Sequence, residues 1–292
     1  MRQLVISVLA AALSGLLAHA QELRVLKDVT YGTASGRELK LDAYLSEGAS
    51  LSPAVIFIHG GGWRRGDKAQ VPEFLKQPMQ DAGISIISVG YRLSDVAPYP
   101  AQVQDVTRAV QFVRYKSREW HLNPDRMAVM GPSAGGHLAL WIGLQDDLAK
   151  AQASDPVERQ STRVSAIVNY FGPVDFYLLR KMEHKHPAYR TLFGYQETDP
   201  VSVVTEEQMR SVSPITYVSQ GDPPVFTAHG AADVTVPVEH ARRLIAKLKE
   251  AGVPNENYLL EGGNHGLSNP APGWPDFRKA TVEFLRKHLR GR

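Results

Sequence analysis

The stretch Gly131-Pro132-Ser133-Ala134-Gly135-Gly136 decides the fold of this chain. It follows an apolar run at 127–130 and precedes 137–144, where apolar residues occupy one face of a predicted helix. A strand that enters a sharp turn and a helix that leaves it match the G-x-S-x-G pattern, in which small residues let the backbone turn tightly around a strained serine. We therefore predict that the Ser133 hydroxyl is a nucleophile at the carboxyl edge of a sheet, facing the free N–H groups of the helix.

Apolar runs and helical patterns alternate along the rest of the chain. Continuous apolar runs predict strands at 54–58, 84–89, 164–170, 225–229 and 258–261. Apolar residues at helical spacing predict helices at 101–116, around 241–248 and at 277–285. Two alternating segments, Leu23–Tyr31 and Leu39–Tyr44, predict an N-terminal antiparallel hairpin. The alternation indicates an α/β fold with a mostly parallel central sheet, helices on both faces and the active site at the carboxyl ends of the strands.

Two other segments interrupt this pattern. Asn123-Pro124-Asp125 is predicted to be the turn that leads into the strand before the serine. The stretch from Asp175 to Gln220 has no clear periodicity and is too long for a simple connection, so we predict an insertion that lies over the active site.

The N-terminus has the features of an export signal. Arg2 is followed by Leu4–Leu17, which contains no charged residue, and Ala18-His19-Ala20 is a small-x-small cleavage site. The apolar segment is short for a bilayer-spanning helix, for which about 20 residues are needed. We predict a signal peptide over residues 1–20 that is cut after Ala20, a catalytic domain over 21–292, a secreted or periplasmic protein, and no stable membrane insertion after cleavage.

Composition limits the range of partners. The 292 residues are 43% hydrophobic and 22% charged, as in an ordinary globular protein, and the formal net charge is +3. With no basic run, nucleic acid is not predicted as a partner. The absence of cysteine means that stability cannot rely on disulfides. The sequence carries no signal of oligomeric state.

A serine nucleophile requires a base and an acid that orients the base. Asp233 follows the predicted strand 225–229, and His265 follows the last predicted strand between glycines. This order of serine, acid and histidine is the one expected for such a sheet, so Ser133, Asp233 and His265 are the predicted catalytic residues. Asp175, after the preceding strand, is the alternative acid.

The remaining histidines are assigned other roles. His137, on the helix behind the serine, and His240, on a surface helix face, are predicted to be structural. His184 and His186 lie in the aperiodic segment and could line the pocket, but they lack the clustered acids or cysteines of a metal site, so neither a metal nor any other cofactor is predicted.

His59-Gly60-Gly61-Gly62-Trp63 follows the inner strand 54–58, where glycines would let backbone N–H groups approach an oxyanion. His59 is predicted to brace this loop, and Trp63 to form a wall of the substrate pocket.

Taken together, the stretches His59–Trp63, Gly131–Gly136, His229–Asp233 and Gly263–Gly266 resemble those of α/β-hydrolases of the esterase and lipase kind. More narrowly, the chain resembles the BD-FAE group, which are secreted esterases that act on acetyl and feruloyl groups of plant polysaccharides. Further matching stretches are Tyr91-Arg92-Leu93, Asn123–Arg126 and Ser213–Val218. The resemblance implies the same triad and assigns the oxyanion donors to Gly61, Gly62 and Ala134. Hormone-sensitive-lipase relatives usually carry an N-terminal helical cap, which the strand-like segment 23–44 does not offer.

Three classes of function compete. The first is a serine carboxylic-ester hydrolase that cleaves short-acyl esters, small or polysaccharide-linked, through an acyl-enzyme. The second is an amide hydrolase, either a kynurenine-formamidase-like enzyme or a small serine peptidase. The third is a non-catalytic binding protein, which would be expected to lack a triad residue. The presence of all three triad residues counts against the third class, and a chain of this length leaves no room for the large propeller domain that prolyl-oligopeptidase-type peptidases usually carry. The sequence therefore favours the esterase.

Overall fold

A computed structural model describes residues 23–48, 50–182, 186–267 and 276–290. The predicted signal peptide and His184 lie outside these residues. The described chain contains one eight-stranded sheet with the strand order β1-β2-β4-β3-β5-β6-β7-β8. The strands are β1 (Leu23–Ala34), β2 (Arg37–Ser46), β3 (Ser52–Ile58), β4 (Ser85–Val89), β5 (Leu122–Pro132), β6 (Ala166–Tyr170), β7 (Val225–Gly230) and β8 (Asn255–Leu260).

The sheet is antiparallel at one end and parallel elsewhere. Strand β1 pairs antiparallel with β2, and β2 pairs antiparallel with β4, whereas every pairing among β3 to β8 is parallel. This confirms the predicted N-terminal hairpin and mostly parallel sheet of an α/β-hydrolase fold. The carboxyl ends of β5, β7 and β8 meet at one edge, so the loops that follow these strands can present side chains to a common site.

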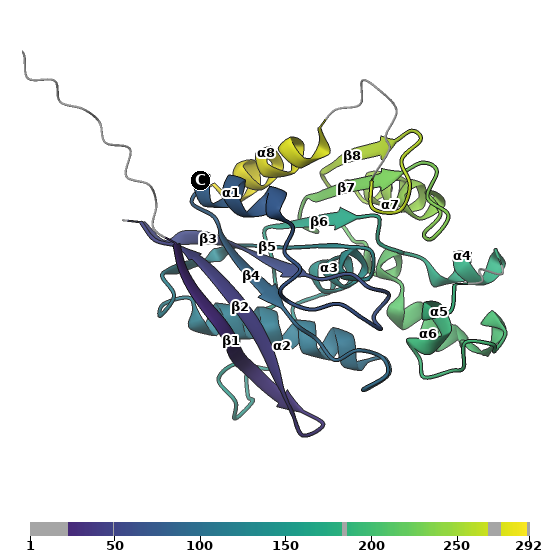
Figure 1. The fold of residues 1–292 in the computed structure, drawn as a ribbon, viewed down its shortest axis with the longest axis horizontal. Helices are drawn as coiled ribbons and strands as arrows, with labels where there is room; N and C mark the ends of the chain where they lie inside the picture. The colour runs from purple at the N-terminus through teal and green to yellow at the C-terminus, as the bar shows by residue number, and fades with distance from the viewer. Residues whose placement is uncertain (1–22, 49, 183–185, 268–275, 291–292) are drawn as a thin grey trace, which may run out of the picture.

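Helices cover both faces of the sheet (Figure 1). On one face lie α1 (Glu73–Asp81) and α8 (Phe277–Leu289), and on the other lie α2 (Ala101–Lys116), α3 (Ala134–Leu144) and α7 (Glu239–Glu250). Alternate residues of a strand point to opposite faces, so Val55 of β3 packs into the core under α1 and α8 and Ile56 into the core under α2 and α3. Two hydrophobic cores therefore hold the sheet between them.

Two elements differ from the sequence-based expectation. Helix α1 was not predicted, because it contains Pro78 and buries only Leu75 and Met79. The predicted turn Asn123-Pro124-Asp125 lies within β5, which begins at Leu122, and the Asp125 N–H donates to Asn123 Oδ1 at 2.9 Å as in an Asx turn. Leu122 pairs with Ser52, and an irregularity in the register of β3 and β5 accommodates the proline-containing segment before regular pairing resumes at Met127.

The aperiodic segment 175–220 folds into short helices. These are α4 (Phe176–Lys181), α5 (Ala188–Thr191), η1 (Val201–Val203), α6 (Glu206–Val212) and η2 (Pro214–Tyr217). Because each has seven residues or fewer, none is long enough to show helical periodicity in the sequence. None of the helices in the described part of the chain has the length and apolar character needed to cross a membrane.

Candidate active site

Ser133 lies in a strained turn between β5 and α3. Its backbone angles are φ 53° and ψ −121°, a conformation that residues other than glycine rarely adopt. Its N–H donates to the Tyr170 carbonyl at 2.8 Å, which ties the turn to β6. A Cβ at Gly135 would lie 2.0 Å from the Ile58 carbonyl oxygen, so only glycine lets α3 approach β3 this closely. The packing thus explains the glycine two positions after the serine.

The three predicted catalytic side chains lie in hydrogen-bond contact. The His265 Nδ1–H donates to Asp233 Oδ2 at 2.7 Å, and the Ser133 hydroxyl lies 3.0 Å from His265 Nε2. Since the carboxylate oxygen can only accept, this arrangement leaves Nε2 free to accept the serine proton. The ring of Phe171 packs edge-on against the His265 imidazole, with the two centroids 4.7 Å apart. The arrangement has the geometry of a nucleophile, a base and an orienting acid.

The Asp233 carboxyl is held as an anion. Burial raises its pKa, but hydrogen bonds from the imidazoles of His229 and His265 outweigh this effect. Backbone N–H groups also donate to Oδ1, from Thr235 at 2.8 Å and from Val236 at 2.9 Å. The pKa of Asp233 therefore lies well below its usual range, and the carboxylate stays ionised wherever the imidazole must be neutral.

Sequence reasoning assigned no role to His229, which is fully buried beneath Asp233. Its Nε2–H donates to the Val236 carbonyl at 2.8 Å and lies 3.4 Å from Asp233 Oδ2. The spacing of four residues between His229 and Asp233 is visible in the sequence, but only the folded loop shows that it brings the two side chains together.

The glycine-rich loop after β3 borders the serine. Gly61 and Gly62 have φ angles of 108° and 62°, and a Cβ at Gly61 would lie 2.0 Å from the Arg65 carbonyl oxygen. Within the described ranges, the backbone N–H groups of Gly61, Gly62 and Ala134 donate to no other group. Donors of this kind are available to a developing oxyanion.

His59 and Trp63 flank this loop and are both buried. His59 Nδ1–H donates to the Gly60 carbonyl at 2.8 Å, and its ring stacks on Tyr91, whose hydroxyl donates to the His59 carbonyl at 3.0 Å. Burial lowers the pKa of His59, so the ring is a neutral part of the loop. Trp63 Nε1–H donates to His137 Nδ1 at 3.3 Å.

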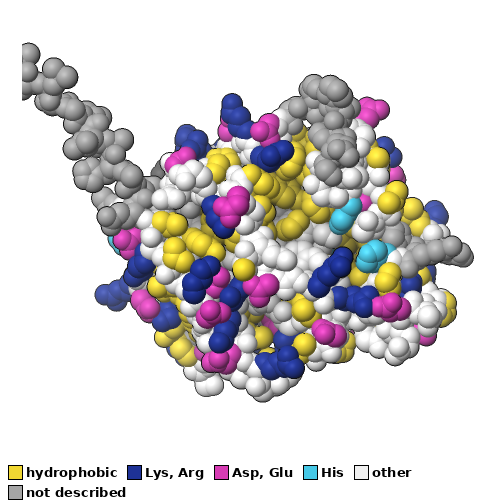
Figure 2. Space-filling view, in the orientation of Figure 1, with side chains coloured by type: hydrophobic (Ala, Val, Ile, Leu, Met, Phe, Trp, Pro, Cys, Tyr) yellow, Lys and Arg dark blue, Asp and Glu magenta, His cyan; other side chains and the backbone are white. Residues whose placement is uncertain are grey.

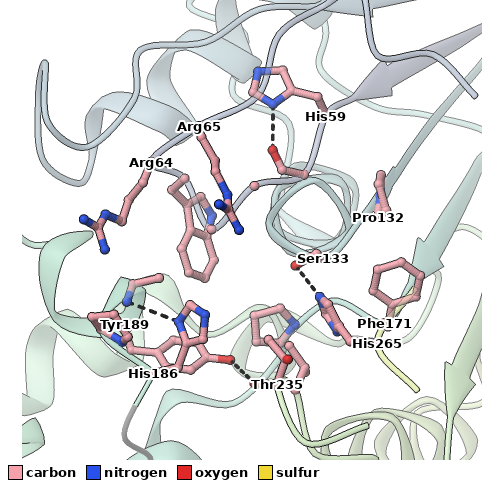
Figure 3. Close-up of a pocket in the computed structure, with 18 of the residues that line it drawn as sticks. His59, Arg64, Arg65, Pro132, Ser133, Phe171, His186, Tyr189, Thr235 and His265 are labelled. Carbon is pink, nitrogen blue, oxygen red and sulfur yellow. Dashed lines mark hydrogen bonds between the residues drawn. The ribbon is translucent and has the colours of Figure 1, made fainter. Parts of the chain in front are cut away.

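A cavity of about 750 Å³ opens beside Ser133 (Figure 3). This volume lies within the range of small-molecule sites. Its lining includes Trp63, Ser133 and His265 from the predicted site. Sequence reasoning placed His186 here as well but missed several other lining residues, including Arg64, Arg65, Phe171 and Thr235. These come from loops whose paths over the sheet edge have no signature in the sequence.

The alternative acid and the other histidines have different partners. Asp175 caps α4 by accepting from the Leu178 N–H at 3.2 Å, and its other carboxylate oxygen pairs with Arg243 at 2.5 Å. His137 is buried, its Nε2–H donates to the Val212 carbonyl, and burial lowers its pKa to about 4. The prediction that His240 lies on a surface face is wrong: it is fully buried, and its Nδ1 accepts from the Val174 and Asp175 N–H groups.

Groups of three or more histidine, aspartate, glutamate or cysteine side chains with the spacing of a metal site are absent from the residues that the structure describes.

Comparison with known proteins places these features in a family. The BD-FAE family model matches residues 41–248. Among curated proteins, the esterase LipQ of Mycobacterium tuberculosis is 31% identical over 88% of this chain, and the probable carboxylic ester hydrolase LipM of the same organism is 30% identical over 76%. The chain spans only 62% and 51% of the lengths of these two relatives.

Solved structures are similar over nearly the whole chain. A carbohydrate esterase from gut microbiota, in truncated form, superposes with a TM-score of 0.78 and 26% identity, and the match covers 93% of this chain and 98% of that one. An acetyl ester-xyloside bifunctional hydrolase from Caldicellulosiruptor lactoaceticus superposes with a TM-score of 0.74 and 25% identity, and the match covers 94% of this chain and 98% of that one. For a propionate-bound esterase from Thermogutta terrifontis the TM-score is 0.68 and the identity 26%, over 93% of this chain and 94% of that one.

Proposed function

Because this chain belongs to the BD-FAE family of α/β-hydrolases, we propose that it is a serine esterase that hydrolyses short-acyl carboxylic esters through an acyl-enzyme. The observation that carries the proposal is the hydrogen-bonded chain from Ser133 through His265 to Asp233, set beside an open cavity. The relatives named as esterases support it. None of the similar proteins described above carries the name of an amide hydrolase, so the alternative is not favoured.

In the proposed mechanism, the Ser133 oxygen attacks the ester carbonyl while His265 Nε2 takes the hydroxyl proton. The resulting oxyanion would accept from the N–H groups of Gly61, Gly62 and Ala134. His265 then gives its proton to the departing alcohol, which leaves an acyl-serine. Water, activated by the same imidazole, hydrolyses this ester and restores the serine.

The Asp233 carboxylate orients the imidazole throughout this cycle and stabilises it when it is positively charged. Its two backbone N–H donors fix the carboxylate, so the His265 ring is held with Nε2 toward the serine. Asp233 therefore acts by keeping the His265 proton on Nδ1, so that Nε2 can accept the proton of the serine.

For the substrate, we propose a short acyl group on a bulkier alcohol, including acetyl or feruloyl groups on plant polysaccharide. Support comes from two proteins of similar structure, a carbohydrate esterase and an acetyl ester-xyloside bifunctional hydrolase. The cavity supports it too, because arginine and histidine side chains and backbone glycines share the lining with its apolar residues.

Acyl-chain length tests this proposal. The kcat/KM for acetyl and butyryl p-nitrophenyl esters is expected to exceed that for the palmitoyl ester by at least about tenfold, without activation at an oil–water interface. Each methylene group that stays in water forgoes about 0.8 kcal/mol of binding, and arginine and histidine side chains interrupt the apolar lining of this cavity. Initial rates across the ester series provide the measurement. A preference for chains of about 12 or more carbons would instead place the protein with the lipases.

The pH dependence tests the histidine base. Because Asp233 stays ionised, its titration lies far below the working range, and kcat/KM is expected to rise with pH through one ionisation, that of an imidazole. The sign follows from the mechanism, since only the neutral ring accepts the serine proton. Rates measured from about pH 5 to 9 check this. A flat profile over that range would contradict a histidine base.

We also propose that the enzyme is exported, to the periplasm or beyond, on the strength of the charged and apolar leader before Gln21. Mass spectrometry of the N-terminus of protein recovered outside the cytoplasm would show whether the chain begins at Gln21.

A further inference from the structure

The cavity beside Ser133 has an unbalanced charge. Its described lining contains two arginines, Arg64 and Arg65, and no aspartate or glutamate. The chain as a whole is nearly balanced, with 33 lysines and arginines against 30 acidic residues. Acidic and basic side chains are also interspersed over the face shown in Figure 2. The cationic lining is therefore a local property of the cavity.

The two arginines differ in their partners. Arg64 forms an ion pair with Glu197. Arg65 forms no side-chain ion pair or hydrogen bond with any residue in the described ranges, although its backbone N–H donates to the Gly61 carbonyl at 3.2 Å. In Figure 3 the Arg65 side chain points toward the middle of the cavity, whereas Arg64 points away from it. A guanidinium with its donors available thus faces the space where substrate would lie.

We propose that Arg65 binds a carboxylate carried by the substrate, an inference that rests on the esterase function proposed above. The planar guanidinium matches a carboxylate with two parallel hydrogen bonds, which makes arginine the preferred partner for this group. With no acidic side chain among the described lining residues to compete, the substrate is expected to supply the negative charge.

The position of Arg65 indicates where on the substrate the carboxylate lies. Arg65 comes from the same loop as Gly61 and Gly62, so the anion must lie close to the reacting ester. Arg65 is also exposed to solvent, whereas Trp63, two residues earlier, is buried. We assign the carboxylate to the alcohol part because the proposed acyl group is short, so the bulkier alcohol is the part that can extend to the solvent-exposed Arg65. The substrate class is therefore a short-acyl ester of an acidic sugar, such as an acetylated uronic acid.

A matched pair of substrates tests this. Acetylated methyl glucuronide carries the carboxylate, and acetylated methyl glucoside replaces it with a neutral hydroxymethyl group. We expect the wild-type enzyme to favour the glucuronide by about tenfold in kcat/KM at low salt, a modest factor because Arg65 is exposed. Added salt should reduce the ratio, since it screens exposed charges.

Variants assign the preference to Arg65. In Arg65→Gln the ratio of kcat/KM for the glucuronide to that for the glucoside should fall to about one. In Arg65→Glu the neutral glucoside should become the better substrate. Arg65→Lys keeps the charge without the planar fork and should give an intermediate ratio. Arg118→Gln is the matched control, because Arg118 is exposed and lies outside the cavity lining. This substitution removes the same positive charge as Arg65→Gln, and the variant should keep the wild-type ratio of kcat/KM for the two sugar esters. Thermal unfolding of each variant checks the fold.

Each outcome has a distinct meaning. Hydrolysis of p-nitrophenyl acetate with equal rates on the two sugars, or a preference that survives in Arg65→Gln, overturns this inference alone. No hydrolysis of p-nitrophenyl acetate by folded wild-type protein overturns the esterase proposal as well. A third arm compares p-nitrophenyl hydrogen succinate with p-nitrophenyl butyrate. An Arg65-dependent preference for the succinate would place the anion on the acyl part and overturn the assignment to the alcohol.

Discussion

Replacement of Ser133 by alanine is expected to lower kcat for ester hydrolysis by on the order of 10⁴ to 10⁶ while the protein stays folded. The change removes the attacking oxygen and its hydrogen bond to His265, but it leaves the main-chain hydrogen bond from residue 133 to Tyr170 in place. Steady-state rates on p-nitrophenyl acetate and a thermal unfolding curve provide the measurement.

Ser154→Ala provides the control, because Ser154 is exposed and lies outside the cavity beside Ser133. Its rate should equal that of the wild type. The double variant Ser133→Ala/His265→Ala should have a kcat only slightly below that of Ser133→Ala, because the two residues act in the same step. Near-normal turnover by the Ser133→Ala protein would end the serine-hydrolase proposal.

Replacement of Asp233 by asparagine is expected to lower kcat by about 10⁴. An asparagine amide placed toward His265 Nδ1 would donate a hydrogen bond there, so the imidazole would carry its proton on Nε2. In that tautomer the ring cannot accept the proton of Ser133. The expected loss therefore follows from the 2.7 Å contact between Asp233 and His265.

Asp175→Asn is the matched variant for this experiment. Asp175 follows the preceding strand, β6, but its carboxylate caps α4 and pairs with Arg243. The same loss of one negative charge should change kcat by less than about tenfold, with a modest effect on stability from the weakened cap. A large loss in Asp175→Asn with a small one in Asp233→Asn would move the acid to the earlier strand.

Much of the fold could be predicted because its central strands are buried on both faces. Such strands, as at β3 and β7, read as continuous apolar runs that end at glycine-rich loops. The three side chains Ser133, Asp233 and His265 were predicted as partners because each follows a different strand in the expected order. The structure brings them within hydrogen-bond distance.

What the sequence could not provide depends on tertiary contacts. Helix α1 has too few buried residues to show a pattern, and His240 sits on a helix whose polar neighbours suggest a surface position. In the folded protein, however, the N–H groups of Val174 and Asp175 donate to its ring, and this contact cannot be seen in the sequence. The cavity lining from residues 186–189 likewise depends on how short helices pack across the sheet edge.

The edge position of β8 has a further consequence. His265 is supplied by the loop after this strand, which pairs on one side only, with β7, and whose residues are mostly half-buried. Edge strands with few buried contacts open locally at lower free energy than the middle of a sheet. Ser133 follows β5, a central strand, so the nucleophile and its base belong to regions of different local stability. Under mild denaturing stress the base would separate from the serine first, and inactivation would then precede global unfolding.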